Sequence, residues 1–466
     1  NDLSGAVAVA TGDIAAGATV AAGNDITGNI TVADGVIAAN ITAQNEISGS
    51  IVSTNGAISG TITALLGDLS GNVIAGVGNI ASIVVGGDID GSAISAEDDI
   101  TSIAVTGAIL AGTTITASDA DVDGTGNIGT ITVGDGINAT IAAVNINTIR
   151  SGGLAGEDIE GTITASGDID LVDAGNGIIE ATVTAGVAVP GSPLATFISD
   201  GYSYAVWAIS GTPTSPTEPT AAAGVSAELV FDGNGGNPTL EINNLEGTSA
   251  GTSIYITSRA DTGVEQLFWD PDVDVYDAPI TLTALNAASA ITIGTLYVEG
   301  SFTDIGGDSD ITINNVVVEG GVGGTISVAA GEDIEFGWVE ASLTINVAGG
   351  GKAGDLILKS NSDVANSATA YAINGGAIVS VNGSLSNVYL GDASAGFVGD
   401  LGDSGDVATL TATGSIDDIF IAGDVLGNIR ATSIGDIEVD GNVGNCDDGD
   451  ADTLVDDGVA ASIDIT

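Results

Sequence analysis

Aliphatic residues recur at a short and nearly constant interval in the first part of the chain. The leading residue of each repeat is Ile or Leu, and successive copies lie 9 to 12 residues apart, at Ile14, Ile26, Ile37, Ile47, Ile58, Leu69, Ile80, Ile89, Ile100 and Ile109. Alternating runs such as Ile-Thr-Val follow them, and alternation places every second side chain on the same face of a strand. The pattern predicts a series of short β-strands, each with one buried face.

Glycine, aspartate and asparagine separate the predicted strands. Two examples are Asn-Asp-Ile-Thr-Gly-Asn-Ile at 24–30 and Gly-Asp-Leu-Ser-Gly-Asn-Val at 67–73. Glycine and asparagine accept the backbone angles of tight corners at little steric cost. A strand and its corner use about ten residues, so two or three such units would complete one coil of a parallel β-helix, with coils about 4.8 Å apart.

We therefore predict an all-β fold, a right-handed parallel β-helix (β-solenoid) with an inserted β module in the middle. A meandering β-sandwich is the alternative, although the corners are shorter and more regular than Greek-key loops. The solenoid is expected over 1–186 and a second solenoid segment over 280–466, where alternation returns. The segment 187–279 is interpreted as an inserted β module or an elaborated set of loops, because all 8 prolines lie between Pro190 and Pro279 and no aromatic residue precedes Phe197. Its aromatic residues are interpreted as core, or alternatively as a surface for carbohydrate or a partner.

The charge balance excludes several classes of partner. The chain carries 62 acidic and 5 basic residues, a formal net charge of −57. The negative electrostatic field of this charge repels phosphate backbones and anionic lipid, so we expect no nucleic-acid partner. We also expect no membrane insertion, since no run of 18 apolar residues occurs. The same field opposes self-association unless cations intervene.

Calcium is the one cofactor that the sequence predicts. Alternate carboxylates followed by glycine open a calcium loop at 119–124, and the ninth position of that loop is Asn127. Thr130 stands at the twelfth position, where a bidentate glutamate is expected, so a weaker loop site is favoured over an EF-hand. Two more acidic clusters are candidates, one of them an acidic loop near the C-terminal end, and solvated turns are the alternative for each. The predicted metal ligands are Asp119, Asp121, Asp123, Asn127, Asp270, Asp272, Asp274, Asp447, Asp448, Asp450 and Asp452.

Residues for catalysis are mostly absent. The chain has no histidine, which excludes Ser-His-Asp and Cys-His machinery and imidazole zinc sites. A lyase for acidic polysaccharides needs basic residues to bind its substrate. The five basic residues of this chain are scattered, which disfavours that class of enzyme. Paired carboxylates suffice for a glycoside hydrolase, so that alternative stays open. However, aspartate recurs periodically at the corners, which indicates turns, and we predict that the protein is not an enzyme.

The chain resembles bacterial extracellular β-solenoid proteins in its repeat, in its high content of Ala, Gly, Asp, Ile and Thr, and in its acidic, histidine-free composition. These include the repeat regions of large adhesins, surface-layer proteins and the β-strand-repeat surface proteins of planctomycete-like bacteria. The resemblance covers about 1–185 and, less clearly, 280–466, and no signature motif identifies one protein. It implies an extracellular or cell-surface location, adhesion or assembly, and dependence on calcium.

The leading functional hypothesis is a secreted structural protein that self-assembles into a filament, sheath or surface layer. Open solenoid ends carry unpaired backbone groups and can stack head to tail, so the expected partner is a second copy of the chain. An adhesin that binds cell-surface or matrix glycans through the middle region is the alternative. A polysaccharide-degrading β-helix enzyme is the third hypothesis.

Overall fold

In the computed structural model, almost all of the regular secondary structure is β-strand. The structure describes residues 1–119, 126–152, 157–175, 177–185, 194–199, 202–210, 225–232, 238–249, 252–260, 280–287, 289, 291–298, 300–302, 311–331, 333–359, 371–391, 399–402, 407–440 and 462–465. In these residues the one helical element is a 3₁₀ turn at Ala348–Gly350. The chain forms two compact units, one built mainly from residues before 207 and the other mainly from residues after 238. None of the described elements is a helix long and apolar enough to cross a membrane.

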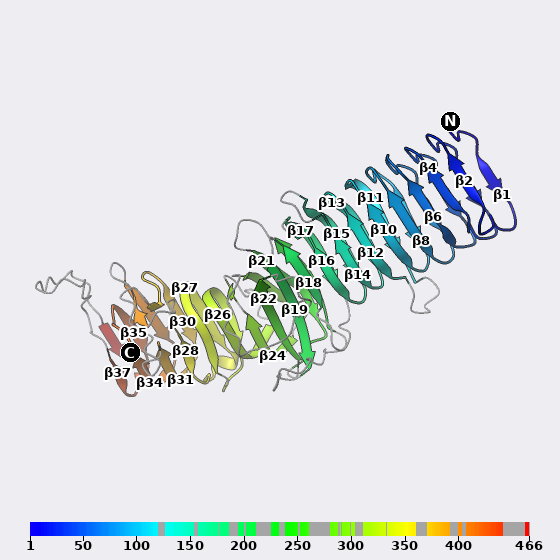
Figure 1. The fold of residues 1–466 in the computed structure, drawn as a ribbon. Coiled ribbons are helices and arrows are strands. Elements are labelled where there is room, and N and C mark those ends of the chain that lie inside the picture. Colours follow the sequence, from blue (N-terminus) through cyan, green and yellow to red (C-terminus); the bar gives the residue numbers. More distant parts are fainter. Residues whose placement is uncertain are drawn as a thin grey trace, which may run out of the picture. The chain divides into compact units, whose positions relative to one another are not determined.

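The first unit contains two stacks of parallel strands, and the chain alternates between them (Figure 1). One stack pairs in the order β1 (Val7–Val9), β3 (Ile30–Val32), β5 (Ile51–Ser53), β7 (Val73–Ala75), β9 (Ala93–Ala96), β11 (Ile109–Ala117), β13 (Ile137–Ala143), β15 (Ile159–Ala165) and β17 (Ile179–Ala185). The other pairs in the order β2 (Thr19–Ala22), β4 (Asn40–Ala43), β6 (Ile58–Ala64), β8 (Ile80–Val85), β10 (Ile100–Val105), β12 (Ile128–Val133), β14 (Ile146–Arg150), β16 (Ile169–Asp173) and β18 (Ala195–Ser199). Each coil therefore uses two of the predicted strand–corner units, and the prediction of an all-β parallel solenoid is confirmed.

The leading aliphatic residues stack from coil to coil, as the period of about ten predicts. Ile26 bridges Ile47, and Ile47 bridges Leu69, at separations of 21 and 22 residues. All three side chains are fully buried. Identical or similar aliphatic side chains from successive coils thus form the core, because parallel strands in register place equivalent residues above one another.

Antiparallel strands cover the last coil of the first unit. β17 pairs with β20 (Ser226–Asp232), and β18 pairs with β19 (Tyr202–Ser210), both antiparallel. Phe197 stacks on Phe231 with ring centroids 5.0 Å apart, and Tyr204 packs against the same ring at 5.0 Å. These aromatic residues of the 187–279 segment are buried, so here they serve as core.

The second unit continues the parallel winding. Its strands are β21 (Thr239–Glu246), β22 (Thr252–Ala260), β23 (Ile280–Ala287), β24 (Ile291–Val298), β25 (Gly300–Phe302), β26 (Ile311–Val328), β27 (Ile334–Val347), β28 (Leu356–Leu358), β29 (Tyr371–Ile373), β30 (Ile378–Asn382), β31 (Leu385–Leu390), β32 (Asp400–Leu401), β33 (Ala408–Ala412), β34 (Ser415–Ile421), β35 (Gly427–Ala431), β36 (Ser433–Ile434), β37 (Ile437–Val439) and β38 (Ser462–Ile465). The pairings β24–β26, β26–β27, β27–β30, β30–β33 and β33–β35 are all parallel. The alternation that returns near Ile280 therefore also belongs to a solenoid.

Candidate functional site

The corner residues tie each coil to the next. The backbone N–H of Asp88 donates to Asp68 Oδ1 at 2.8 Å, and the N–H of Ala108 donates to Asp88 Oδ1 at 2.8 Å. At the opposite corner, Val36 donates to Asp13 Oδ1 and Asp99 donates to Asn79 Oδ1, each at 2.8 Å. Side-chain oxygens of Asp and Asn thus accept N–H groups that the corner leaves outside the strand pairing. We call this arrangement the corner ladder.

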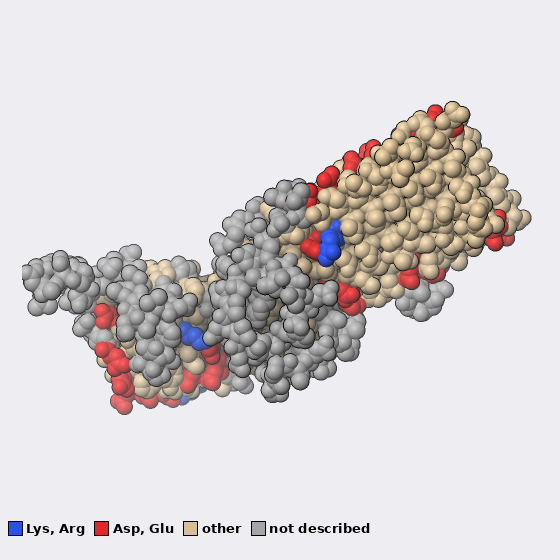
Figure 2. Space-filling model, viewed as in Figure 1, with Lys and Arg blue, Asp and Glu red and all other residues tan. Residues whose placement is uncertain are grey.

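The corner ladder also concentrates the negative charge. The residue directly before the leading aliphatic position is acidic in five successive coils, at Asp2, Asp25, Glu46, Asp68 and Asp88. By contrast, strands β3 to β10 contain no charged residue. Figure 2 shows the result for the first unit, where acidic side chains gather along the rims and leave most of a broad face uncharged.

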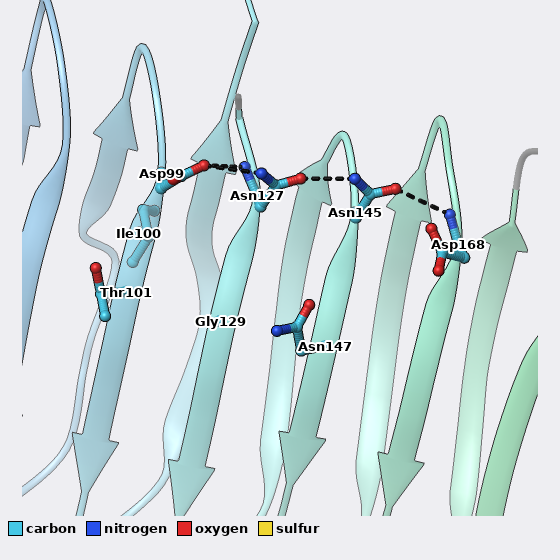
Figure 3. Close-up of a pocket in the computed structure, with 8 residues that line it drawn as sticks. All are labelled: Asp99, Ile100, Thr101, Asn127, Gly129, Asn145, Asn147 and Asp168. Carbon is cyan, nitrogen blue, oxygen red and sulfur yellow. Dashed lines mark hydrogen bonds between the residues drawn. The ribbon is translucent and has the colours of Figure 1, made fainter. Parts of the chain in front are cut away.

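A hollow of about 530 Å³ lies beside one stretch of the corner ladder (Figure 3). Asp99 Oδ1 accepts the backbone N–H of Asn127 at 2.8 Å and its side-chain amide at 3.0 Å. Asn127 Oδ1 in turn accepts the amide of Asn145 at 2.7 Å, and Asn145 Oδ1 accepts the N–H of Asp168 at 3.2 Å. The remaining lining residues are Ile100, Thr101, Gly129 and Asn147.

The hollow offers hydrogen-bonding groups and no assembled catalytic group. Within the described residues, the Asp168 carboxylate, the Thr101 hydroxyl and the Asn147 amide make no hydrogen bond. Burial, and then the charge of Asp168, raise the pKa of the neighbouring Asp170. Such groups can bind water or a neutral polar ligand. The polar lining differs from the mostly apolar walls of typical small-molecule sites.

The predicted metal ligands divide into two groups. Asp119 and Asn127 lie in the described residues, and the structure assigns Asn127 to the corner ladder through its bonds to Asp99 and Asn145. The described residues contain no group of three or more His, Cys, Asp or Glu that could hold a metal ion. Outside the described residues lie Asp121, Asp123, Asp270, Asp272, Asp274, Asp447, Asp448, Asp450 and Asp452. Calcium binding there stays a prediction.

Three of the five basic residues form ion pairs in the described part of the chain. Arg150 Nε donates to Asp173 at 2.6 Å, Lys359 lies 2.8 Å from Glu335, and Lys352 pairs with Asp417. Their side chains are about half exposed, so each pair adds little stability. These pairs provide no cluster of positive charge for an anionic ligand.

The chain matches no family model, no curated protein and no solved structure. Sequence reasoning missed the row of Asp99, Asn127, Asn145 and Asp168 as a unit, although each directly precedes a leading isoleucine. That repeated Asx-Ile dipeptide is the signal by which the row can be found.

The first coil is less buried than the second. Among the described residues, β1 pairs only with β3, and β2 pairs only with β4. Most inward aliphatic residues of 1–22 are partly exposed, whereas their second-coil counterparts Ile26, Ile30 and Ile37 are fully buried.

Proposed function

We propose that the protein is a secreted structural protein that self-assembles head to tail into an extracellular filament, sheath or surface layer. The stacking of coils in register supports this proposal. Neighbouring strands such as β3, β5 and β7 pair in parallel, and the leading aliphatic residues stack from coil to coil. A coil of a second copy placed on an end coil would continue the hydrogen bonds and the core that already join coil to coil.

An adhesin that contacts glycans is the second candidate. The free polar groups of Thr101, Asn147 and Asp168 in the hollow support hydrogen bonding to a neutral saccharide. Trp207, one of the aromatic residues of the 187–279 segment, is only 7% exposed and does not offer a ring face for stacking on sugars. Trp269, the other tryptophan of that segment, lies outside the described residues. Assembly is therefore favoured over glycan binding.

Electron microscopy and light scattering test the proposal directly. Purified protein is incubated at increasing concentration, in calcium and in chelator, and imaged. We expect elongated assemblies whose mean mass rises with protein concentration. Discrete monomers under every condition would overturn the proposal. Saturable binding of neutral oligosaccharides by such monomers would favour the adhesin.

A further inference from the structure

One sheet face of the first unit carries no charged side chain. Strands β4, β6, β8, β10 and β12 lie side by side in one stack (Figure 1), and we call their outward side the uncharged face. Its outward positions hold threonine, serine, alanine, valine, glycine and one asparagine, Asn40. One row of paired outward residues runs across it, through Thr42, Thr63, Val84, Ala104 and Thr132.

Acidic side chains mark the other surfaces of the same unit. On the opposite stack, Glu160 and Glu180 pair on the outward side of β15 and β17, and Asp90 is exposed. The corner ladder adds the acidic residues along the rims (Figure 2). A contact between two copies through any of these surfaces brings carboxylates together, which is unfavourable where water is excluded. The uncharged face avoids that repulsion.

We infer that the uncharged face is a lateral contact between two copies of this chain, packed face to face. This inference rests on the proposed self-assembly and names the contact by which filaments join side by side into a layer or sheath. The hydroxyl groups make the face complementary to itself, because a hydroxyl group both donates and accepts a hydrogen bond. Ser102 Oγ already donates to Ser82 Oγ at 3.1 Å within the face. Two identical patches are what a twofold contact requires.

The geometry of packed sheets keeps the acidic rims of two copies apart. Facing sheets lie about 10 Å from each other, and the small side chains of this face permit that approach. Carboxylates at the rims then stay in water at about one Debye length, roughly 10 Å at 0.1 M salt, where ions screen them. Meanwhile Val84, which is 38% exposed, loses its contact with water.

The size of the uncharged face indicates when the contact forms. Five strands about 4.8 Å apart and about six residues long cover roughly 500 Å² on each copy. A stable pair of proteins usually buries about 800 Å² on each partner. One contact is therefore weak by itself, but contacts repeated along two filaments act together. We expect side-by-side association to follow elongation.

Two matched substitutions test the contact. Thr63 on the uncharged face and Thr116 on the opposite stack are both half-buried, point outward and stand within the same local sequence, Thr-Ile-Thr-Ala. Thr63→Glu and Thr116→Glu therefore add the same charge in similar surroundings, and we expect similar melting temperatures and normal elongation for both. We expect Thr63→Glu to raise the concentration for side-by-side association roughly tenfold or more, and Thr116→Glu to leave it unchanged. Electron microscopy of filament width measures the difference.

Cross-linking tests whether the two faces meet. Val84 on the uncharged face and Leu110 on the opposite stack are each 38% exposed. Cys446, the single native cysteine, is first replaced by serine. We expect a short bis-maleimide to join Val84→Cys chains into covalent dimers in assembled protein, and to join Leu110→Cys chains much less.

The outcomes separate this contact from the proposed function. If the two glutamate variants associate side by side equally well, or the two cysteine variants cross-link equally well, the contact at the uncharged face is wrong and the proposed function stands. The same holds if the unaltered protein forms only single filaments. If the unaltered protein forms no filaments or other extended assemblies, the proposed function itself fails.

Discussion

At the scale of single residues, each common residue type in this chain has a position that its chemistry explains. Isoleucine occupies the leading position, where it is fully buried in most coils. Glycine stands where the carbonyl of the preceding coil leaves no room for a Cβ, as at Gly49. Aspartate and asparagine stand at corners, where they accept an N–H from the next coil. The narrow composition therefore follows from a few positions that recur in every coil.

The position of Asp400 leads to a prediction about pH. Burial raises its pKa to about 6, with the charge of Asp424 adding to the rise, although Asp400 Oδ1 accepts the Asp424 N–H at 2.7 Å. The folded pKa therefore exceeds the unfolded value of about 3.9. The folded state holds the proton more tightly, so stability is lost as pH rises from about 4 to about 6 and stays constant above that range.

Replacing Asp400 with asparagine should remove this loss. The amide oxygen still accepts the Asp424 N–H and carries no charge. We expect Asp400→Asn to be more stable than the unaltered protein at pH 7 by about 1 kcal/mol, a figure reduced for partial exposure. The two proteins should be equally stable near pH 4. Urea unfolding at several pH values measures the difference, and a variant that is less stable at pH 7 would contradict the assignment.

At the scale of elements, the corner ladder joins neighbouring strands at the points where sheet pairing stops. Asp88 shows that the corner ladder makes one stabilising and one destabilising contribution to the fold. Its Oδ1 accepts the Ala108 N–H at 2.8 Å, while its own N–H donates to the stacked Asp68. The hydrogen bond favours the fold, whereas two carboxylates one coil apart repel each other. Which effect is larger can be measured with a pair of substitutions.

We expect Asp88→Ala to destabilise the first unit by about 1 kcal/mol, because the Ala108 N–H loses its acceptor. Asp88→Asn keeps the acceptor and removes the repulsion, so we expect its stability to equal or exceed that of the unaltered protein at low salt. Thermal unfolding at low and high salt checks both changes. An asparagine variant that is as unstable as the alanine variant would show that the carboxylate charge itself is required.

Some of these elements could be predicted from the sequence and others could not. The strands and their buried ladder were predictable because the aliphatic period repeats many times. The corner ladder was predicted only as turns, since the bonded partners lie 18 to 28 residues apart and the length of a coil is needed to match them. For the same reason, the bonds of Asn127 to Asp99 and Asn145 were not predicted, and its role as a calcium ligand stays a prediction. The antiparallel direction of β19 and β20 could not be predicted, because their residues follow no periodic pattern.

At the scale of the whole molecule, the problem for assembly is charge. The formal net charge is −57, so stacking one copy on another brings like charges together. Hydrophobic burial and backbone hydrogen bonds favour the contact, so the balance depends on the cations around it.

The effect of calcium binding on assembly can be separated from that of charge screening by comparing two salts at the same ionic strength. Calcium takes several oxygen ligands, including carboxylates from different elements, so it can bridge acidic residues of two copies as well as screen them. We therefore expect calcium chloride to start assembly at an ionic strength where sodium chloride does not, and chelator to reverse the effect. Light scattering with time follows both conditions. If sodium chloride and calcium chloride act equally at matched ionic strength, the cations only screen the charge. If neither salt changes the assembly rate, repulsion between copies does not limit assembly.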